Sequence, residues 1–201
     1  MKAEEKLKEY KEKRNFTRTT EPPAEVAPPS AKPMFVIQKH DASHLHYDLR
    51  LEIDGVLKSW AVPKGPSMDP QVKHLAVPTE DHPMAYGGFE GTIPEGEYGA
   101  GTVMVWDTGT YHNIKADKPE PETMAQAFDE GRIEVKLEGK KLKGMFALIK
   151  TARGWLFFKM NDEFVRPGDI LEEAPDSALT NRSLEEIAAG SNEWHSKKKV
   201  A

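Results

Sequence analysis

One short segment of the chain carries side chains suited to metal and phosphate chemistry. It places His46, Asp48 and Arg50 at every second position. Alternate residues of a β-strand point to the same side of a sheet, so a strand here would align these three side chains on one face. An imidazole and a carboxylate are metal ligands, and a guanidinium binds phosphate through two parallel hydrogen bonds. A polar strand face is usually just a solvated surface. The combination of these three residue types nevertheless favours a catalytic site.

His40 extends this pattern, because it ends the segment before the strand and lies within reach of the same face. Two imidazoles and one carboxylate suit Mn²⁺, Zn²⁺ or Fe²⁺ and leave open positions for water and substrate. Three ligands therefore indicate a catalytic metal rather than a closed structural site. Five of the seven histidines fall between positions 40 and 82, namely His40, His44, His46, His74 and His82. His44 fits a turn equally well.

Loops after this segment offer further substrate contacts. Lys64 lies in a Pro- and Gly-containing loop, and His82 and Tyr86 lie in the stretch that follows. Loops beside a rigid scaffold often carry functional residues. Taken alone, Lys64 fits a surface lysine and Tyr86 a core aromatic residue. The glycine-rich stretch 91–101 lacks the Lys-Ser/Thr ending of a P-loop and opens no helix, so it predicts tight turns at a barrel rim.

Strands dominate the elements that must position these residues, because the apolar spacing is mostly two. The expected strands cover residues 34–38, 45–53, 56–62, 75–78, 102–106, 133–137, 144–150 and 155–160. Turns are expected at 54–55, 107–109, 139–141 and 152–154, and a short helix at 122–130, opened by Pro121 and stopped by Gly131. About eight short strands with one or two short flanking helices predict a mainly β fold, a barrel or a sandwich.

The ends of the chain differ from this β-rich body. Residues 1–14 predict a short polar helix that buries Leu7 and Tyr10, and the proline-rich stretch 17–33 predicts an extended arm. We therefore expect an N-terminal helix and arm over 1–33, one barrel domain over 34–165 and a C-terminal extension over 166–201. The last ten residues, which include Ser-Lys-Lys-Lys, predict a frayed basic tail.

Composition limits the classes of protein further. The chain has no cysteine, no charge-free stretch of about 20 apolar residues and no signal-peptide pattern at its amino terminus, so we expect a cytoplasmic protein without a membrane span. Its 28 basic and 33 acidic residues give a net charge of −5. That charge argues against a broad basic groove for duplex nucleic acid more strongly than against an enzyme that binds one strand terminus.

Four segments together resemble the 3′-phosphoesterase domain of bacterial DNA ligase D. They are FVIQKHDASHLHYDLRLE at 35–52, WAVPKGPS at 60–67, EDHP at 80–83 and FEGTIPEGEYGAG at 89–101. The resemblance covers about residues 10–160 and suggests a free-standing member, since no ligase or polymerase module is present. It implies a β-barrel enzyme, typically manganese-dependent, that removes a 3′-terminal ribonucleoside and then the 3′-phosphate during end joining, with a repair ligase and polymerase as partners.

The resemblance also assigns residues, position by position. His40, His46 and Asp48 match the metal ligands, Arg50, His82 and Tyr86 match residues around the scissile phosphate, Lys64 matches a further active-site position, and Arg14 and Glu21 match functional positions of the N-terminal arm. Two positions depart from the family pattern. Asn15 replaces the usual Asp, and His74, a candidate phosphate contact, replaces the usual Arg. The loss of a carboxylate and of a permanent cation predicts that one of the two activities is weakened.

Two other interpretations fit parts of the sequence. A cupin-like barrel would bind a metal through His44 and His46 and act on a small molecule, although Glu52 is poorly placed for the glutamate that such a site needs. A catalytically silent module that binds repair partners through its tails is the other. Metal-dependent release of phosphate from a 3′-phosphorylated strand separates both from the phosphoesterase interpretation.

Overall fold

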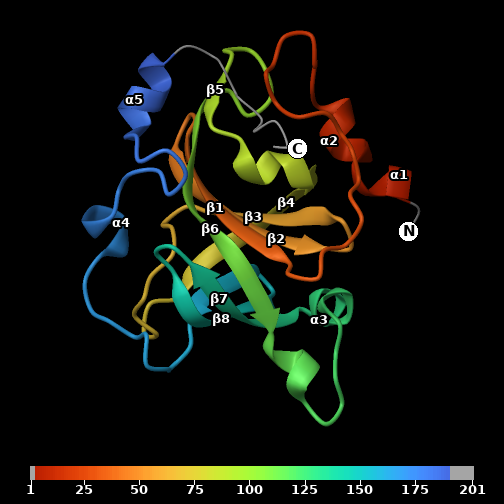
Figure 1. The fold of residues 1–201 in the computed structure, drawn as a ribbon, viewed down its shortest axis with the longest axis vertical. Coiled ribbons are helices and arrows are strands. Elements are labelled where there is room, and N and C mark those ends of the chain that lie inside the picture. Colours follow the sequence, from red (N-terminus) through yellow and green to blue (C-terminus); the bar gives the residue numbers. More distant parts are fainter. Residues whose placement is uncertain (1–2, 191–201) are drawn as a thin grey trace, which may run out of the picture.

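Antiparallel strands close into a barrel at the centre of the chain (Figure 1). The computed structural model describes residues 3–190. The strands are β1 (Met34–Asp41), β2 (Leu45–Ile53), β3 (Val56–Val62), β4 (His74–Pro83), β5 (Gly91–Ile93), β6 (Gly101–Asn113), β7 (Arg132–Gly139), β8 (Lys143–Thr151) and β9 (Gly154–Lys159). The helices are α1 (Ala3–Lys6), α2 (Lys8–Glu12), α3 (Met124–Glu130), α4 (Ile170–Glu173) and α5 (Leu184–Ala189), with 3₁₀ turns η1 (Met84–Gly88) and η2 (Ile114–Asp117).

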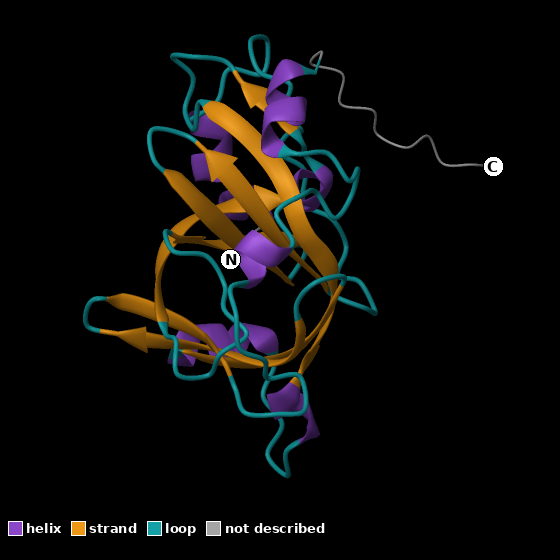
Figure 2. Cartoon of the chain, turned by 90° about the vertical axis from the view of Figure 1, so that its left-hand side faces the viewer, coloured by secondary structure: helices purple, strands orange, loops and turns teal. Residues whose placement is uncertain are grey.

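The barrel closes through the pairing of β1 with β6. Within the sheet the order is β1-β2-β3-β4-β9-β8-β7-β6-β5, and because β1 also pairs with β6, eight strands form a closed ring with β5 added beside β6. The short helices lie outside this ring (Figure 2). The prediction of a mainly β barrel of about eight strands with few short helices is confirmed.

The hairpin of β2 and β3 follows the sequence prediction residue for residue, at 45–53 and 56–62. Asp54 and Gly55 form its turn with φ of 52° and 81°, in the left-handed region that an Asp-Gly pair tolerates best. A Cβ atom on Gly55 would lie 1.9 Å from the carbonyl oxygen of Ala27, whose amide donates back to Gly55. The hairpin therefore needs glycine here both for its turn and for its contact with the proline-rich arm.

Some boundaries differ from the prediction. The turn expected at 107–109 is wrong, because β6 runs without a break from Gly101 to Asn113. Its buried Asp107 accepts hydrogen bonds from three backbone amides of the β7–β8 turn, so this residue serves another turn rather than forming its own. Helix α3 begins after a capping box on Thr123, not at Pro121, and ends at Gly131 as predicted. The short strand β5 lies inside the glycine-rich stretch, where only turns were expected.

Apolar side chains pack in two places. Alternate residues of the strands fill the inside of the barrel, among them Leu49, Leu51 and Trp60. A second cluster lies outside, where Leu7, between α1 and α2, and Tyr10 of α2 pack with residues of β3, η1 and β5. The predicted burial of Leu7 and Tyr10 is confirmed, whereas the predicted helix is split into α1 and α2. This second cluster holds the N-terminal segment against the outer face of the sheet.

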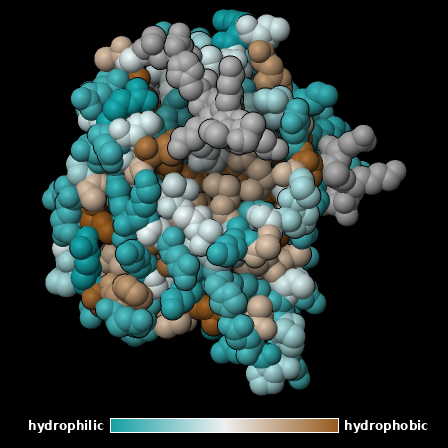
Figure 3. All heavy atoms as spheres, viewed as in Figure 1, coloured by the Kyte–Doolittle hydropathy of each residue, from teal (hydrophilic) through white to brown (hydrophobic). Residues whose placement is uncertain are grey.

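The C-terminal segment packs against β5 and β6 and is held by polar contacts. Glu90 accepts hydrogen bonds from Ser177 and Thr180, and the indole of Trp106 donates to the carbonyl of Ala174 at 2.8 Å. The predicted basic tail falls in 191–201 and so lies outside the described residues. Between 3 and 190, no helix combines the length and the apolar character needed to cross a membrane. On the face of Figure 1, strongly hydrophobic residues show only in small separate places (Figure 3).

Candidate active site

The pairing of β1 with β2 brings the candidate ligands together on the outer face of the barrel. His40 lies opposite His46, and Gln38 lies opposite Asp48. Cross-strand partners share one face of a sheet, so the four side chains project outward while Leu49 projects into the core. The alternation expected from the sequence therefore places the polar face of β2 under a pocket rather than in open solvent.

His40, His46 and Asp48 form a group of potential metal ligands. Nδ1 of His40 lies 3.6 Å from one carboxylate oxygen of Asp48, and Nε2 of His46 lies 3.5 Å from the other. One ligand atom from each residue lies within 4.8 Å of the other two. Atoms that bind one ion at about 2.0–2.2 Å lie roughly 3–4 Å apart, so a small rotation of the side chains would close the set around a cation.

The remaining ring nitrogen of each histidine is held by a backbone carbonyl. Nε2 of His40 lies 2.9 Å from the oxygen of Gly99, and Nδ1 of His46 lies 2.9 Å from the oxygen of His44. A ligand histidine usually donates its second N–H in this way, which fixes the tautomer and aims the free nitrogen at the metal. Each imidazole therefore directs its other nitrogen toward Asp48. Two imidazole nitrogens and a carboxylate are the donor set of a divalent transition metal.

Arg50 lies next to this group, with every arm of its guanidinium engaged. It donates to Gln38 at 2.7 Å, to Ser59 at 2.8 Å and to Asp48 at 3.2 Å, and one nitrogen lies 3.0 Å from Nδ1 of His82. The side chain is 3% exposed. Such a fixed fork holds a positive charge at one place beside the potential metal ligands, in an orientation suited to a phosphate oxygen.

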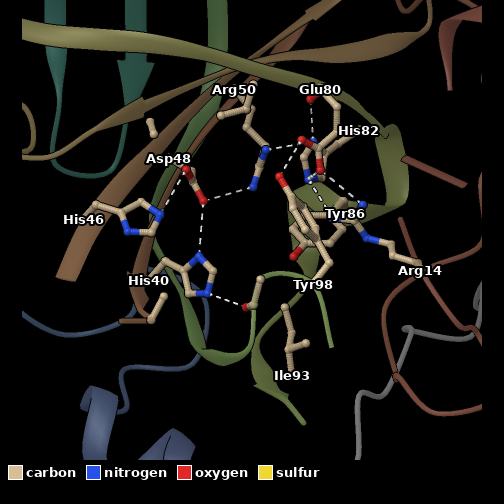
Figure 4. Close-up of a pocket in the computed structure, with 14 residues that line it drawn as sticks. Arg14, His40, His46, Asp48, Arg50, Glu80, His82, Tyr86, Ile93 and Tyr98 are labelled. Atoms are coloured by element: carbon tan, nitrogen blue, oxygen red, sulfur yellow. Dashed lines mark hydrogen bonds and ion pairs between the residues drawn. The ribbon is translucent and has the colours of Figure 1, made fainter. Parts of the chain in front are cut away.

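A second ion-pair network comes from the N-terminal arm and β4. Arg14 donates to Glu21 at 2.8 Å and to Glu80 at 3.2 Å, and another of its nitrogens lies 3.3 Å from Nε2 of His82. The side chains of Arg14 and Glu21 are 4% and 1% exposed. The close-up shows Arg14 on the far side of His82 from Arg50 (Figure 4). The arm therefore completes the pocket as well as covering the sheet.

The two ends of the pocket shift pKa values in opposite directions. The hydrogen bond with Asp48 is the main reason that the pKa of His46 is raised. Burial alone would raise the pKa of Asp48, but the charge of Arg50 and the hydrogen bonds of both histidines outweigh it and lower that pKa. At the other end, burial, together with the charges of Arg50 and Arg14, holds the pKa of His82 well below its usual 6.5.

Tyr86 lies under His82 and stays protonated. Its ring centre is 4.6 Å from that of His82, and the guanidinium of Arg50 lies 4.9 Å from it. Burial, and next the charge of Glu21, raises the pKa of Tyr86 well above 10. A neutral phenol beside two guanidinium groups is a hydrogen-bond donor that does not lose its proton in the ordinary pH range.

All the residues that line this pocket, except Arg14, lie in a stretch that matches a protein-family model. Residues 38–150 match the model of the DNA ligase D 3′-phosphoesterase domain, which is more than half of the chain. The chain belongs to this family. It is 46% identical over 188 residues to the multifunctional non-homologous end joining protein LigD of Pseudomonas aeruginosa, covering 89% of this chain and 22% of that protein.

Two further relatives are LigD proteins of similar sequence identity. The LigD protein of Mycolicibacterium smegmatis is 46% identical over 169 residues, covering 83% of the chain and 22% of that protein. The non-homologous end joining DNA repair protein LigD of Mycobacterium tuberculosis is 44% identical over 166 residues, covering 79% and 20%. The chain thus spans about a fifth of the length of these curated relatives.

The pocket gathers most of the residues named from the sequence. Its cavity of about 250 Å³ is lined by Arg14, His40, His46, Asp48, Arg50, His82 and Tyr86, among others. Glu21 supports it through Arg14. Lys64 and His74 are not among the lining residues. Lys64 is exposed after β3, and His74 binds the carbonyl of Gly65 through Nδ1 at 2.6 Å.

The other residues singled out from the sequence have local roles. Asn15 accepts hydrogen bonds from the amide and hydroxyl of Thr17, so its side chain shapes a turn of the arm. His44 is exposed in the bend between β1 and β2, and only its backbone oxygen meets His46. The group of potential metal ligands therefore contains His40 and not His44, unlike the site that the cupin-like interpretation requires.

Sequence reasoning missed several residues that line the pocket or hold its arginines in place. Gln38 and Ser59 orient Arg50, Glu80 binds Arg14, and Tyr98 lines the pocket from the glycine-rich loop. Two of them could have been found from the strand period of two. Gln38 lies two residues before His40, and Glu80 lies two before His82, so each shares a strand face with a predicted site residue. Ser59 and Tyr98 had no such signal, because their positions depend on the pairing of β3 and on the path of a loop.

Proposed function

We propose that this chain is a divalent-metal-dependent 3′-phosphoesterase that acts on the 3′ ends of nucleic-acid strands during end joining. It removes a 3′-terminal ribonucleoside and a 3′-phosphate and leaves a 3′-hydroxyl. The observation that carries the proposal is the convergence of His40, His46 and Asp48 beside the buried guanidinium of Arg50. Membership of the 3′-phosphoesterase family supports the same reaction class.

The metal in this proposal is Mn²⁺, with Zn²⁺ or another divalent transition metal as alternatives, held by His40, His46 and Asp48. The carbonyl-held imidazoles and the ionised carboxylate fit such an ion. When bound, it would polarise a phosphate oxygen and lower the pKa of a water. Asp48 must stay ionised to bind the metal. Burial alone would raise its pKa, and the positive charge of Arg50 opposes this and lowers the pKa.

The other end of the pocket binds the phosphate. Arg50 and Arg14 lie on either side of His82 and offer guanidinium N–H donors to oxygens that gain charge in the transition state. Burial and the two arginines keep His82 neutral before a phosphate binds. A bound phosphate would offset their positive charge. His82 would then hold a phosphate oxygen or pass a proton to a leaving oxygen. Tyr86 adds a phenolic donor.

The partners in this proposal are the 3′ end of a primer strand and the ligase and polymerase that use the repaired end. The relatives are named as multifunctional end-joining proteins, and the chain corresponds to about a fifth of their length. A reaction that restores a 3′-hydroxyl supplies the group that ligation and extension both require.

The test uses a labelled primer–template carrying either a 3′-phosphate or a single 3′-ribonucleotide. Mn²⁺, Zn²⁺, Mg²⁺ and a chelator are compared with the wild-type chain and with Asp48→Ala. We expect phosphate and ribonucleoside release with a transition metal, and release at background level with chelator or with Asp48→Ala, because the central ligand is then missing.

The matched control is Asp117→Ala, which removes an aspartate that pairs with a histidine on the surface, with its side chain 67% exposed. It should behave as wild type. If Asp48→Ala releases phosphate at a rate near that of Asp117→Ala, the metal assignment is wrong. If no metal supports release by the wild-type chain, the proposed activity itself is wrong.

A further inference from the structure

An exposed aromatic ring stands at the mouth of the phosphoesterase pocket, and none of the roles assigned above uses it. Tyr98 is 46% exposed, although it lines the cavity together with the metal ligands and the arginines. In the close-up its hydroxyl points toward Glu80 while its ring lies between Glu80 and His40 (Figure 4). An apolar ring kept exposed at the entrance of a polar cavity is a surface available to a ligand.

The loop that carries Tyr98 is held on both sides, so the ring has a fixed place. Gly99 has a φ of 75°, and its carbonyl binds His40 at 2.9 Å. On the other side, Arg18 of the N-terminal arm pairs with Glu97 at 3.0 Å. The residues before and after Tyr98 are thus tied to the arm and to a metal ligand, and the ring needs little ordering when a ligand arrives.

The contacts of Tyr98 place it at the phosphate-binding end. Its hydroxyl lies 3.3 Å from Glu80 and 3.3 Å from Nζ of Lys13, and that ammonium lies 4.6 Å from the ring centre. The guanidinium of Arg14 lies 5.5 Å from the same ring. These two cations lie over the ring. The part of the ring that stays exposed, next to the proposed phosphate site, is the kind of aromatic surface on which proteins stack nucleobases.

From these observations we infer that Tyr98 is a recognition residue on which the base of the 3′-terminal ribonucleoside stacks. This inference rests on the proposed function. The ring lies beside Glu80 and Arg14, and a nucleoside attached through the scissile phosphate extends beyond that phosphate toward the pocket mouth. A strand that ends in a 3′-phosphate has no such nucleoside. Stacking on Tyr98 therefore favours ribonucleoside removal and leaves phosphate removal unaffected.

Steady-state kinetics of the metal-loaded chain on the two ends tests this assignment. We expect Tyr98→Ala to lower kcat/KM for ribonucleoside removal about ten-fold or more, and to change phosphate release by less than about two-fold. Tyr98→Phe keeps the ring and should stay near wild type. A substrate whose terminal ribose lacks its base should lower the wild-type rate by the same factor, and should lower the Tyr98→Ala rate no further.

A binding measurement separates this inference from the activity. A terminal 2-aminopurine ribonucleotide, mixed with the chain in chelator, should lose fluorescence on stacking with wild type and Tyr98→Phe, but not with Tyr98→Ala. Val165→Ala, which trims another exposed apolar residue outside the pocket, is the control.

Three results would overturn the inference: equal loss of both activities in Tyr98→Ala, a loss in Tyr98→Phe as large as in Tyr98→Ala, or unchanged quenching without the ring. A wild-type chain that quenches through Tyr98 but turns over neither end supports base stacking and refutes the proposed reaction.

Discussion

The two ends of the pocket shift the pKa of a histidine in opposite directions. At the carboxylate end, the bond with Asp48 raises the pKa of His46. At the guanidinium end, burial and two arginines lower the pKa of His82. The first environment attracts a cation and the second an anion, although the two histidines lie on β2 and β4 of one sheet, with only β3 between them. The difference shows that the neighbours of each histidine, rather than the residue type, set its chemical role.

Arg50 belongs to both ends and sets the boundary between them. It donates to Asp48 at 3.2 Å, and its other terminal nitrogen lies 3.0 Å from His82. Its charge helps to keep Asp48 ionised and His82 neutral. If the ends are functionally distinct, substitutions at one should affect metal binding and substitutions at the other should affect phosphate turnover.

The largest effect is expected from Asp48→Asn, which keeps the shape of the carboxylate end and removes its charge. Loss of an orienting partner of a ligand costs roughly 10–100-fold in metal affinity, so loss of a ligand itself should exceed that. Calorimetric titration with Mn²⁺ should show affinity weakened by more than about 100-fold, with phosphate release at background. If Asp48→Asn binds Mn²⁺ within about three-fold of the wild-type affinity, the carboxylate end is not the metal site and the two ends do not differ as proposed.

Arg50→Lys tests the boundary from the other side. Lysine keeps the charge but cannot reproduce a fork that reaches Gln38, Ser59 and Asp48 together. We expect kcat for phosphate release to fall about 10²–10³-fold, the usual cost of losing one oriented transition-state donor. Mn²⁺ affinity in the same titration should change by only a few-fold. Equal losses of affinity and turnover would show that the two ends act as one unit.

A double-mutant cycle on Arg14 and Glu21 measures how firmly the arm belongs to the guanidinium end. Both side chains are buried, so urea unfolding of Arg14→Ala, Glu21→Ala and the double variant should give a coupling of about 1–3 kcal/mol. Arg166 and Glu173 form the matched control, because they also lie 2.8 Å apart but are about half exposed. Their coupling should not exceed about 1 kcal/mol. Similar couplings for both pairs would contradict a structural role of the arm in the pocket.

The carboxylate end could be predicted from the sequence better than the guanidinium end. His46, Asp48 and Arg50 follow the period of one strand, and a two-stranded pairing adds His40, so local rules suffice. At the guanidinium end, Arg14 lies 68 positions from His82 and reaches it only because the second apolar cluster holds the arm on the sheet. No periodicity encodes that contact, and only the family resemblance pointed to Arg14.

The same limit explains the boundaries that the sequence misplaced. Asp107 and Gly109 have the composition of a turn, yet the pairing of β6 with both β1 and β7 keeps them in a strand. Lys64 and His74 carry suitable chemistry, but Lys64 follows the end of β3 and His74 begins β4, and neither is among the residues that line the pocket. Residue type indicates what a side chain can do, whereas sheet closure decides which side chains meet.

The smallest expected effect, and the most direct test of the comparison, is the pH dependence of stability without metal. The pKa of His46 is raised in the folded chain, so folded His46 binds more protons than the unfolded chain near pH 6.5. Its contribution is present below that pH and is lost as the pH rises through the folded pKa. His82 has the opposite sign, because the unfolded chain takes up a proton below pH 6.5 that the folded chain excludes.

Urea unfolding between pH 5 and 8 in chelator should therefore give two opposite difference curves. His46→Asn should remove a loss of stability that wild type shows above pH 6.5, where the hydrogen bond with Asp48 depends on the protonated ring. His82→Asn should remove a loss that wild type shows below pH 6.5, where burial and two guanidinium groups oppose protonation. His112→Asn, at an exposed histidine, corrects for general effects of the substitution. If both differences in unfolding free energy change in the same direction with pH, the neighbours do not shift the pKa values of His46 and His82 in opposite directions. The proposed contrast between the two ends would then be wrong.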